Sequence, residues 1–223
     1  MYLYLYCSEN KEGQNRGGPG RNRSEFSERL VRKALRDYCD RNRLEISDET
    51  IQSMPIIKGE KGKPYINGLP EACGIPAIHY SVSHSGNWWG CLIAGESVGF
   101  DLEILRDNVN YEKIARRYFT EEEYQWILSA GPEAFFDVWV RKEAYVKYRG
   151  TGLAEGLDRF TVIAEGVPAQ QVLSAERGVR EPLPCYITPC RIGKGIKAAY
   201  CCGSRNKARE MIFLEKGSSH EQK

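Results

Sequence analysis

The 223-residue sequence lacks several features that would each mark a class of protein. No apolar run is long enough to span a bilayer, and the apolar segment 1–7 has neither a basic leader nor a cleavage pattern. The formal net charge is only +2, which gives no reason to expect bulk binding to nucleic acid or to a membrane surface. We therefore expect a cytoplasmic protein that acts on neither.

Familiar cysteine and catalytic motifs are also missing. No two of the eight cysteines have C-x-x-C spacing, so neither a zinc knuckle nor a disulfide framework is expected, and reduced thiols are. The nucleophile elbow G-x-S-x-G and the P-loop order G-x-x-x-x-G-K-[ST] are both absent. These absences argue against a serine hydrolase of the elbow type and against a P-loop enzyme.

The pattern of apolar and turn residues predicts an α+β protein. Strands are expected at 2–7, 78–83, 88–94 and 98–105, a hairpin around 55–66, and helices at 24–41, 110–118, 120–131 and 132–149. Thr120 and Glu123 form a capping box, and residues 160–213 alternate in the manner of short strands. This order favours two α+β halves, 1–104 and 105–213, followed by a polar tail at 214–223.

Two acidic residues share one face of the strand that begins at Val98. Side chains alternate along a strand, so Phe100 and Leu102 point to the core while Asp101 and Glu103 point away from it. The two acidic residues then lie roughly 7 Å apart along the backbone, close enough for both carboxylates to reach one cation. A strand with a solvated acidic face would give the same pattern, so this motif alone does not distinguish a cation site from an exposed strand face.

A third carboxylate lies on the helix expected at 132–149. On a helical wheel, Glu143 falls within the apolar stripe, Lys147 lies one turn later beside it, and Lys142 lies at the edge of the stripe. A carboxylate that faces a core is unstable unless it is paired or binds a metal. An i,i+4 ion pair between Glu143 and Lys147 is the alternative, although it does not explain the inward position.

Asp101, Glu103 and Glu143 together predict a metal site. A ligand set of carboxylate oxygens, with no histidine or cysteine, favours a hard cation such as Mg²⁺ or Mn²⁺ over zinc. Because Mg²⁺ shares its coordination with substrate phosphates, the site points to phosphate-ester or diphosphate chemistry.

Two further motifs would suit a phosphate group. Ser83 and Ser85 flank His84 at a strand end, where hydroxyls and an imidazole could form a cradle. The basic, glycine-rich turn around Lys63 could bind a phosphate as a point charge, or it could be an exposed hairpin tip.

In this order, these segments resemble the 4′-phosphopantetheinyl transferases of the monomeric, surfactin-synthetase-activating type. The matching motifs are GKPY at 62–65, SHSG at 83–86, GFDLE at 99–103, WVRKEAYVK at 139–147 and GTGL at 150–153. The resemblance spans roughly residues 24 to 202. It implies two similar α/β halves related by pseudo-two-fold symmetry, with a ligand cleft between them, and a protein that acts as a monomer.

The resemblance also implies roles for individual residues. It implies that Asp101, Glu103 and Glu143 bind Mg²⁺. It also implies that Lys63 and His84 bind the 3′-phosphate of coenzyme A, with added contacts from Ser83. Lys142 and Lys147 match contacts to the diphosphate, and Arg23 and Ser24 fall where the family places nucleotide contacts.

The implied reaction transfers the 4′-phosphopantetheine group of coenzyme A to a serine hydroxyl of an apo acyl or peptidyl carrier protein, and it releases 3′,5′-adenosine bisphosphate. Glu143 is the expected general base, and Lys147 is expected to stabilise the transition state. The segment 106–119, with basic residues around Tyr118 and Phe119, is a candidate surface for the acidic carrier, although ordinary helix amphipathicity explains the same pattern. The alternatives are a Mg²⁺-dependent phosphodiesterase or nuclease, and a carrier-binding module without activity.

Overall fold

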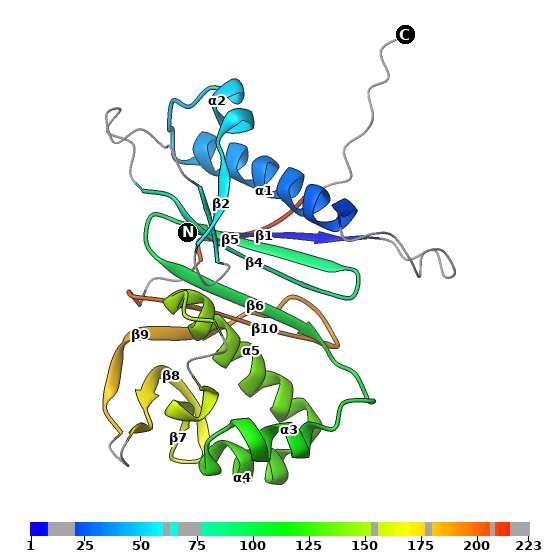
Figure 1. Cartoon of the computed structure of the whole chain (residues 1–223), viewed down its shortest axis with the longest axis vertical. Helices are drawn as coiled ribbons and strands as arrows, with labels where there is room; N and C mark the ends of the chain where they lie inside the picture. Colours follow the sequence, from blue (N-terminus) through cyan, green and yellow to red (C-terminus); the bar gives the residue numbers. More distant parts are fainter. Residues whose placement is uncertain are drawn as a thin grey trace.

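Two β-sheets face each other in the centre of the protein, and helices cover their outer sides (Figure 1). This computed structural model describes residues 1–8, 21–59, 63–66, 77–152, 156–176, 180–205 and 208–214. The first sheet has the order β11-β1-β5-β4. Its strands are β1 (Tyr2–Cys7), β4 (His79–Ser85), β5 (Trp88–Ala94) and β11 (Glu210–Phe213). All neighbours in it are antiparallel except β1 and β11.

The second sheet is antiparallel and has the order β6-β10-β9-β8-β7. Its strands are β6 (Val98–Ile104), β7 (Phe160–Ala164), β8 (Val167–Ser174), β9 (Pro182–Pro189) and β10 (Ile196–Cys202). A separate hairpin pairs β2 (Ile56–Lys58) with β3 (Pro64–Ile66), as the sequence predicts. The protein is thus mixed α+β.

The described residues also form the α-helices α1 (Arg21–Arg41), α2 (Asp48–Ser53), α3 (Tyr111–Tyr118), α4 (Glu121–Ala130) and α5 (Pro132–Arg149), and a short 3-10 helix, η3 (Leu157–Arg159). The predicted capping box of α4 is present, because Thr120 and Glu123 bond reciprocally across its first turn. Pro132 begins α5, and Gly150 ends it in the left-handed conformation with φ 68°. Helix α2 was not expected, and α1 begins three residues before the predicted start at Ser24.

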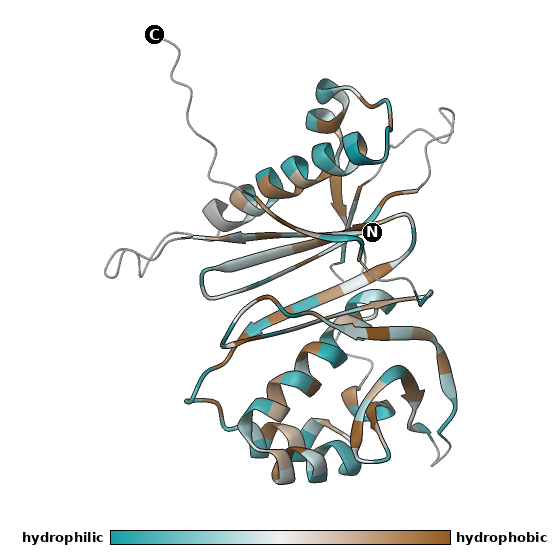
Figure 2. Cartoon of the chain, turned by 180° about the vertical axis from the view of Figure 1, so that it is seen from behind, coloured by the Kyte–Doolittle hydropathy of each residue, from teal (hydrophilic) through white to brown (hydrophobic). Residues whose placement is uncertain are grey.

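Three apolar clusters hold these layers together. One lies between α1 and the first sheet, a second between the two sheets, and a third between the second sheet and the α4–α5 pair. Apolar and polar residues alternate along α1, as expected for a helix that covers a sheet with one face (Figure 2). On β6, Phe100 and Leu102 lie in the middle cluster, so the predicted facing of this strand is confirmed.

The chain crosses between the sheets twice, which differs from a simple division after Ile104. Strand β6 precedes that point but belongs to the second sheet, where it pairs with β10. Strand β11 comes near the end of the described chain but pairs with β1 in the first sheet. The expected tail at 214–223 lies outside the described residues except for Leu214, which is buried.

Within the described residues, no helix is both long and apolar enough to cross a membrane. In the same part of the chain, Cys39, Cys91, Cys185 and Cys201 are buried as thiols.

Gly99 lets α5 approach β6 more closely than any other residue would allow. A Cβ atom at this position would lie 1.9 Å from the carbonyl oxygen of Ala144 and 2.3 Å from the backbone nitrogen of Tyr148. Both obstructing atoms belong to the backbone of α5, so no side chain can move aside. The contact sets the depth of α5 on β6, and therefore the position of Glu143 relative to Asp101.

We predict that Gly99→Ala destabilises the protein by about 3 kcal/mol, because overpacking against backbone forces the helix away. Chemical denaturation of the variant measures this loss. Gly193→Ala is the matched control, since the nearest atom to its added Cβ is 3.8 Å away. A loss for Gly99→Ala as small as that for Gly193→Ala would contradict the close packing described here.

Candidate active site

Asp101 is a buried carboxylate at the junction of three elements. It projects from β6, is 4% exposed, and its Oδ1 accepts two hydrogen bonds of 2.7 Å. One comes from Ser83 Oγ on β4 and the other from Lys147 Nζ on α5. Within the described part of the chain, Asp101 Oδ2 is buried without a hydrogen-bond partner. One oxygen is therefore held in place while the other is left to accept a further ligand.

Lys147 pairs with Asp101 and also donates to the carbonyl oxygen of Val82, at 3.3 Å. The i,i+4 ion pair with Glu143 that the helix pattern allowed is not the contact that positions this ammonium group. Lys147 instead joins α5 to both sheets at the acidic site.

Serine side chains connect β4 to β6, the edge strands of the two sheets. Ser81 Oγ accepts a hydrogen bond from the backbone N–H of Phe100 at 2.9 Å. Two residues further on, Ser83 bonds Asp101, and two residues after that, Ser85 Oγ donates to Glu103 Oε2 at 2.5 Å. We call Ser81, Ser83 and Ser85 the serine ladder. The strands run in the same direction, and serine hydroxyls bridge them where a shared sheet would have backbone hydrogen bonds.

Glu103 lies at the more exposed end of the acidic pair. Its side chain is 22% exposed and also forms a 2.6 Å ion pair with Arg106, whose own side chain is 52% exposed. Arg106 donates a second hydrogen bond, of 3.2 Å, to Ser85 Oγ. Glu103 is therefore fixed from one side by a buried serine and from the other by a half-exposed arginine.

Two carboxyl groups of the site have raised pKa values. Burial, together with the charges of Asp101 and Glu103, raises the pKa of Glu143 to about 7, while Lys147 opposes the effect. Burial also raises the pKa of Asp101, against the lowering by Lys147 and by the hydrogen bond from Ser83. These shifts show that Glu143 and Asp101 lie close enough to interact in a poorly solvated site.

The donor set fits a hard divalent cation. It consists of carboxylate oxygens, one of which, Asp101 Oδ2, is buried and has no hydrogen-bond partner in the part of the chain that the structure describes. A bound cation would relieve the mutual repulsion of these carboxylates. Among the described residues, however, no three acidic, histidine or cysteine side chains already converge in a metal-binding arrangement. The residues suit Mg²⁺, but the side chains are arranged around Ser83, Lys147 and Arg106 instead.

Lys142 lies elsewhere than the resemblance implies. Its side chain is fully buried, and its ammonium nitrogen lies 2.7 Å from Glu123 Oε2 and within 2.7 Å of the carbonyl oxygens of Leu157 and Phe160. Three acceptors thus occupy the three donors of this ammonium group. Instead of meeting a diphosphate, Lys142 connects α5 to Glu123 of α4, to Leu157 and to Phe160, the first residue of β7.

The candidate 3′-phosphate residues do not converge on the carboxylates. Lys63 Nζ donates to the carbonyl oxygens of Val98, at 3.0 Å, and Tyr148, at 3.3 Å, so it bridges β6 and the end of α5. His84 is exposed and points to the face of β4 opposite Ser83, because side chains alternate along a strand. The hydroxyl–imidazole cradle that the sequence suggested is therefore not formed by neighbouring side chains.

The two candidate nucleotide contacts lie in the first turn of α1. Ser24 is exposed there. The backbone of Arg23 belongs to the same helix, but its side chain lies outside the described residues. Neither residue is brought to the acidic site by a described contact.

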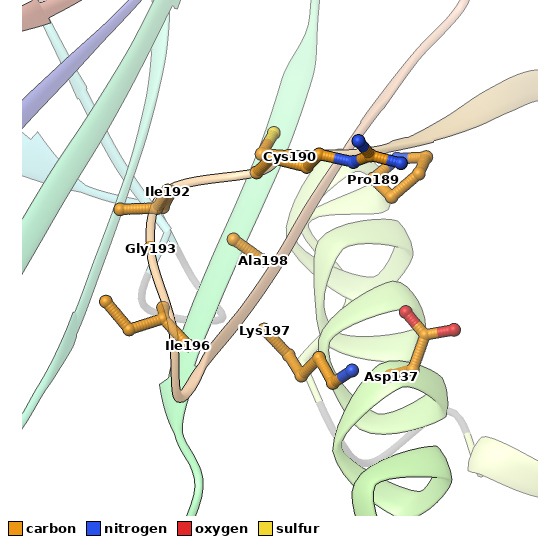
Figure 3. Close-up of a pocket in the computed structure, with 9 residues that line it drawn as sticks. Asp137, Pro189, Cys190, Ile192, Gly193, Ile196, Lys197 and Ala198 are labelled. Atoms are coloured by element: carbon orange, nitrogen blue, oxygen red, sulfur yellow. The ribbon is translucent and has the colours of Figure 1, made fainter. Parts of the chain in front are cut away.

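An apolar cavity of about 220 Å³ opens beside Glu103. It is lined by Glu103, Arg106, Val109, Ile114, Phe135, Phe136 and Trp139. A larger cavity, of about 450 Å³, lies between the β9–β10 connection and α5 (Figure 3). Lys197 and Asp137 face each other in it, but none of the predicted site residues lines it. The smaller cavity is thus the one that belongs to the acidic site.

Sequence reasoning missed two features of this site. It treated Ser85 as part of a phosphate cradle, although alternation along β4 could have placed it opposite His84. It saw Glu123 only as a capping residue, although Glu123 also pairs with Lys142 and accepts from the backbone N–H of Val162. No local signal in the sequence reports a partner on another helix.

We predict that Glu143→Gln flattens the dependence of stability on pH in metal-free protein. A folded-state pKa of about 7, above the reference value of 4.5, means that the contribution of Glu143 is fully present below pH 4.5 and is lost as the pH rises through 7. The variant should therefore gain roughly 2 kcal/mol over the wild type at pH 8 and little at pH 5. Urea denaturation in EDTA at both values measures this. An equal slope in the two proteins would show that Glu143 is not desolvated.

Comparison with known proteins shows which family this chain resembles. A family model described as the 4′-phosphopantetheinyl transferase superfamily matches residues 97–186, a segment that contains Asp101, Glu103 and Glu143. The chain is 32% identical over 148 residues to the 4′-phosphopantetheinyl transferase Sfp of Bacillus subtilis (strain 168), which covers 64% of this chain and 60% of that protein.

Two further relatives match over more of their own length. The 4′-phosphopantetheinyl transferase gsp of Aneurinibacillus migulanus is 30% identical over 183 residues, covering 80% of this chain and 68% of gsp. AcpT of Salmonella typhi is 31% identical over 148 residues, covering 63% of this chain and 74% of AcpT. For three of the Bacillus relatives the match spans between 42% and 60% of the relative's length. Taken with the acidic site that the matched segment builds, this similarity shows that the chain belongs to the 4′-phosphopantetheinyl transferase superfamily.

Proposed function

We propose that this protein transfers the 4′-phosphopantetheine group of coenzyme A to a serine hydroxyl of an apo acyl or peptidyl carrier protein. The observation that carries the proposal is Asp101 Oδ2, which is buried without a hydrogen-bond partner among the described residues, near Glu143 and Glu103 and within the segment that matches the family. An unsatisfied carboxylate oxygen in such surroundings calls for a cation. A cation held by carboxylates is suited to a diphosphate substrate.

In the proposed reaction, the serine oxygen of the carrier forms a bond to the β-phosphorus of coenzyme A. The bond from that phosphorus to the bridging oxygen breaks, its electron pair leaves on that oxygen, and 3′,5′-adenosine bisphosphate departs. Glu143 takes the proton of the serine hydroxyl. Glu143 suits this task because it lies on α5, close enough to Asp101 and Glu103 to interact with both.

Asp101, Glu103 and Glu143 would hold the metal ion. Mg²⁺, or Mn²⁺ in its place, would neutralise the diphosphate charge when bound. Lys147 lies at the same carboxylates and supplies a fixed positive charge for the developing phosphate charge. Coenzyme A contacts from Lys63, Ser83, His84, Arg23 and Ser24 remain part of the proposal. Lys142 is proposed to support α5 from behind.

We also propose that the ligand cleft lies between two halves related by pseudo-two-fold symmetry. Each half lays one long helix, α1 or α5, on the outer face of its sheet (Figure 1), which supports this arrangement. All the residues named above come from one chain, so the reaction is proposed for a monomer. Reduced thiols suit a cytoplasmic setting.

The carrier is proposed to approach along α3. Arg106 lies at the rim of the cavity beside Glu103, and Arg117 stacks on the half-exposed ring of Tyr118 at 5.2 Å. Basic side chains around an exposed aromatic ring suit an acidic partner. Phe119, in contrast, is 6% exposed and stacks on Phe135 at 5.7 Å, so it belongs to the core and not to this surface.

We predict that the protein adds one phosphopantetheine to an apo-carrier in the presence of coenzyme A and Mg²⁺, and that EDTA abolishes the addition. Intact mass spectrometry of the carrier measures it directly. Glu143→Gln should lower the rate by about 100-fold or more, since it removes both the base and a metal ligand.

Glu133→Gln is the matched control, because Glu133 lies on the same helix but is 69% exposed and pairs with Lys197. It should retain the wild-type rate. Modification that persists in EDTA would overturn the metal requirement. Cleavage of nucleic acid without coenzyme A would favour a nuclease, and binding of several apo-carriers without mass change would favour an inactive module.

A further inference from the structure

The carboxylates of β6 are oriented from the opposite sheet by alternate residues of one strand. Ser81, Ser83 and Ser85 occupy every second position of β4 and are 3%, 7% and 4% exposed. All three point toward β6, since residues two apart share a face of a strand. Because these side chains are buried, hydrogen bonds with β6 take the place of hydrogen bonds with water.

The three members of the ladder differ in what they hold. Ser81 accepts from a backbone N–H of β6, that of Phe100. Ser85 also accepts from a backbone N–H, that of Ile104 at 3.1 Å, but in addition it donates to Glu103 Oε2 at 2.5 Å. Because the backbone N–H orients the hydroxyl as an acceptor, the hydroxyl proton is left to point at the carboxylate. Ser85 thus fixes the Glu103 carboxylate relative to the backbone of β6.

We propose that Ser85 is a positioning residue that fixes the Glu103 carboxylate for metal binding, with Ser83 doing the same for Asp101. Ser85 acts in this way only if the proposed function holds, because Glu103 needs an exact position only if it binds the metal. Without Ser85, the half-exposed Arg106 is left as the described partner of Glu103, and the carboxylate is free to follow that arginine toward solvent. Partners that orient a metal ligand typically contribute 10–100-fold to metal affinity.

The ladder provides its own control for the experiment. Ser85→Ala and Ser81→Ala each deprive one backbone N–H of β6 of its acceptor, so both lose stability in the same way. Ser85→Ala alone also removes the donor to the Glu103 carboxylate, together with the acceptor of the 3.2 Å hydrogen bond by which Arg106 reaches the same site. A difference in metal affinity between these two variants therefore isolates the positioning role from a general loss of stability.

The experiment is a titration of each full-length protein with Mn²⁺ in the presence of coenzyme A, in which the electron paramagnetic resonance signal of free Mn²⁺ reports binding. We expect Ser85→Ala to raise the Kd for Mn²⁺ about tenfold or more, while Ser81→Ala stays near the wild type. Ser85→Thr, which keeps the hydroxyl, should restore the affinity. Affinity for coenzyme A in EDTA should be the same in all four proteins.

Ser83→Ala carries the same test if Ser85→Ala does not fold, and its expected effect is smaller because Lys147 still holds Asp101. Equal Mn²⁺ affinity in Ser85→Ala and Ser81→Ala, in a protein whose wild type binds Mn²⁺ and modifies a carrier, would overturn the role of Ser85 alone. A wild type that binds no Mn²⁺ and modifies no carrier would overturn the proposed function itself.

Discussion

The buried charge of Asp101 is the constraint on which the arrangement of the two sheets and α5 depends. A carboxylate that is 4% exposed is unstable unless its neighbours supply hydrogen bonds or opposite charge. Here Ser83 comes from the first sheet and Lys147 from α5, while Asp101 itself belongs to the second sheet. One side chain therefore links β4, β6 and α5, among which the described residues form no backbone hydrogen bonds. The remaining oxygen, Oδ2, is the atom of this carboxylate that is proposed to bind the metal ion.

Local signals in the sequence predicted much of the fold. The bounds of β1 and β5, the capping box of α4, the start of α5 at Pro132 and its end at Gly150 all agree with expectation, because turn and capping residues act over a few positions. Alternation on β6 also separated Phe100 and Leu102 from the acidic pair. The residues that define the chemistry could therefore be named before any spatial information was available.

What the sequence did not reveal depends on contacts between distant elements. A helical wheel assumes that a helix buries one apolar side. Helix α5 instead packs against both the second sheet and α4, so the charged residues Arg141 and Lys142 are buried along with its apolar residues. The partner of Lys142 is Glu123 on another helix, and no periodicity within α5 could identify it. The same holds for β4, where a motif that looked like a single cradle divides its side chains between two faces.

The two chain crossings mean that the halves of this protein are not independent pieces. A chain cut after Ile104 would separate β6 from β10, the neighbour to which it is hydrogen bonded, and β11 from β1. Each fragment would carry an edge strand that belongs to the other. Such fragments would recover both pairings only if each gave its edge strand to the sheet of the other. A circularly permuted version of the chain would have to preserve the β6–β10 and β1–β11 pairings to keep both sheets complete.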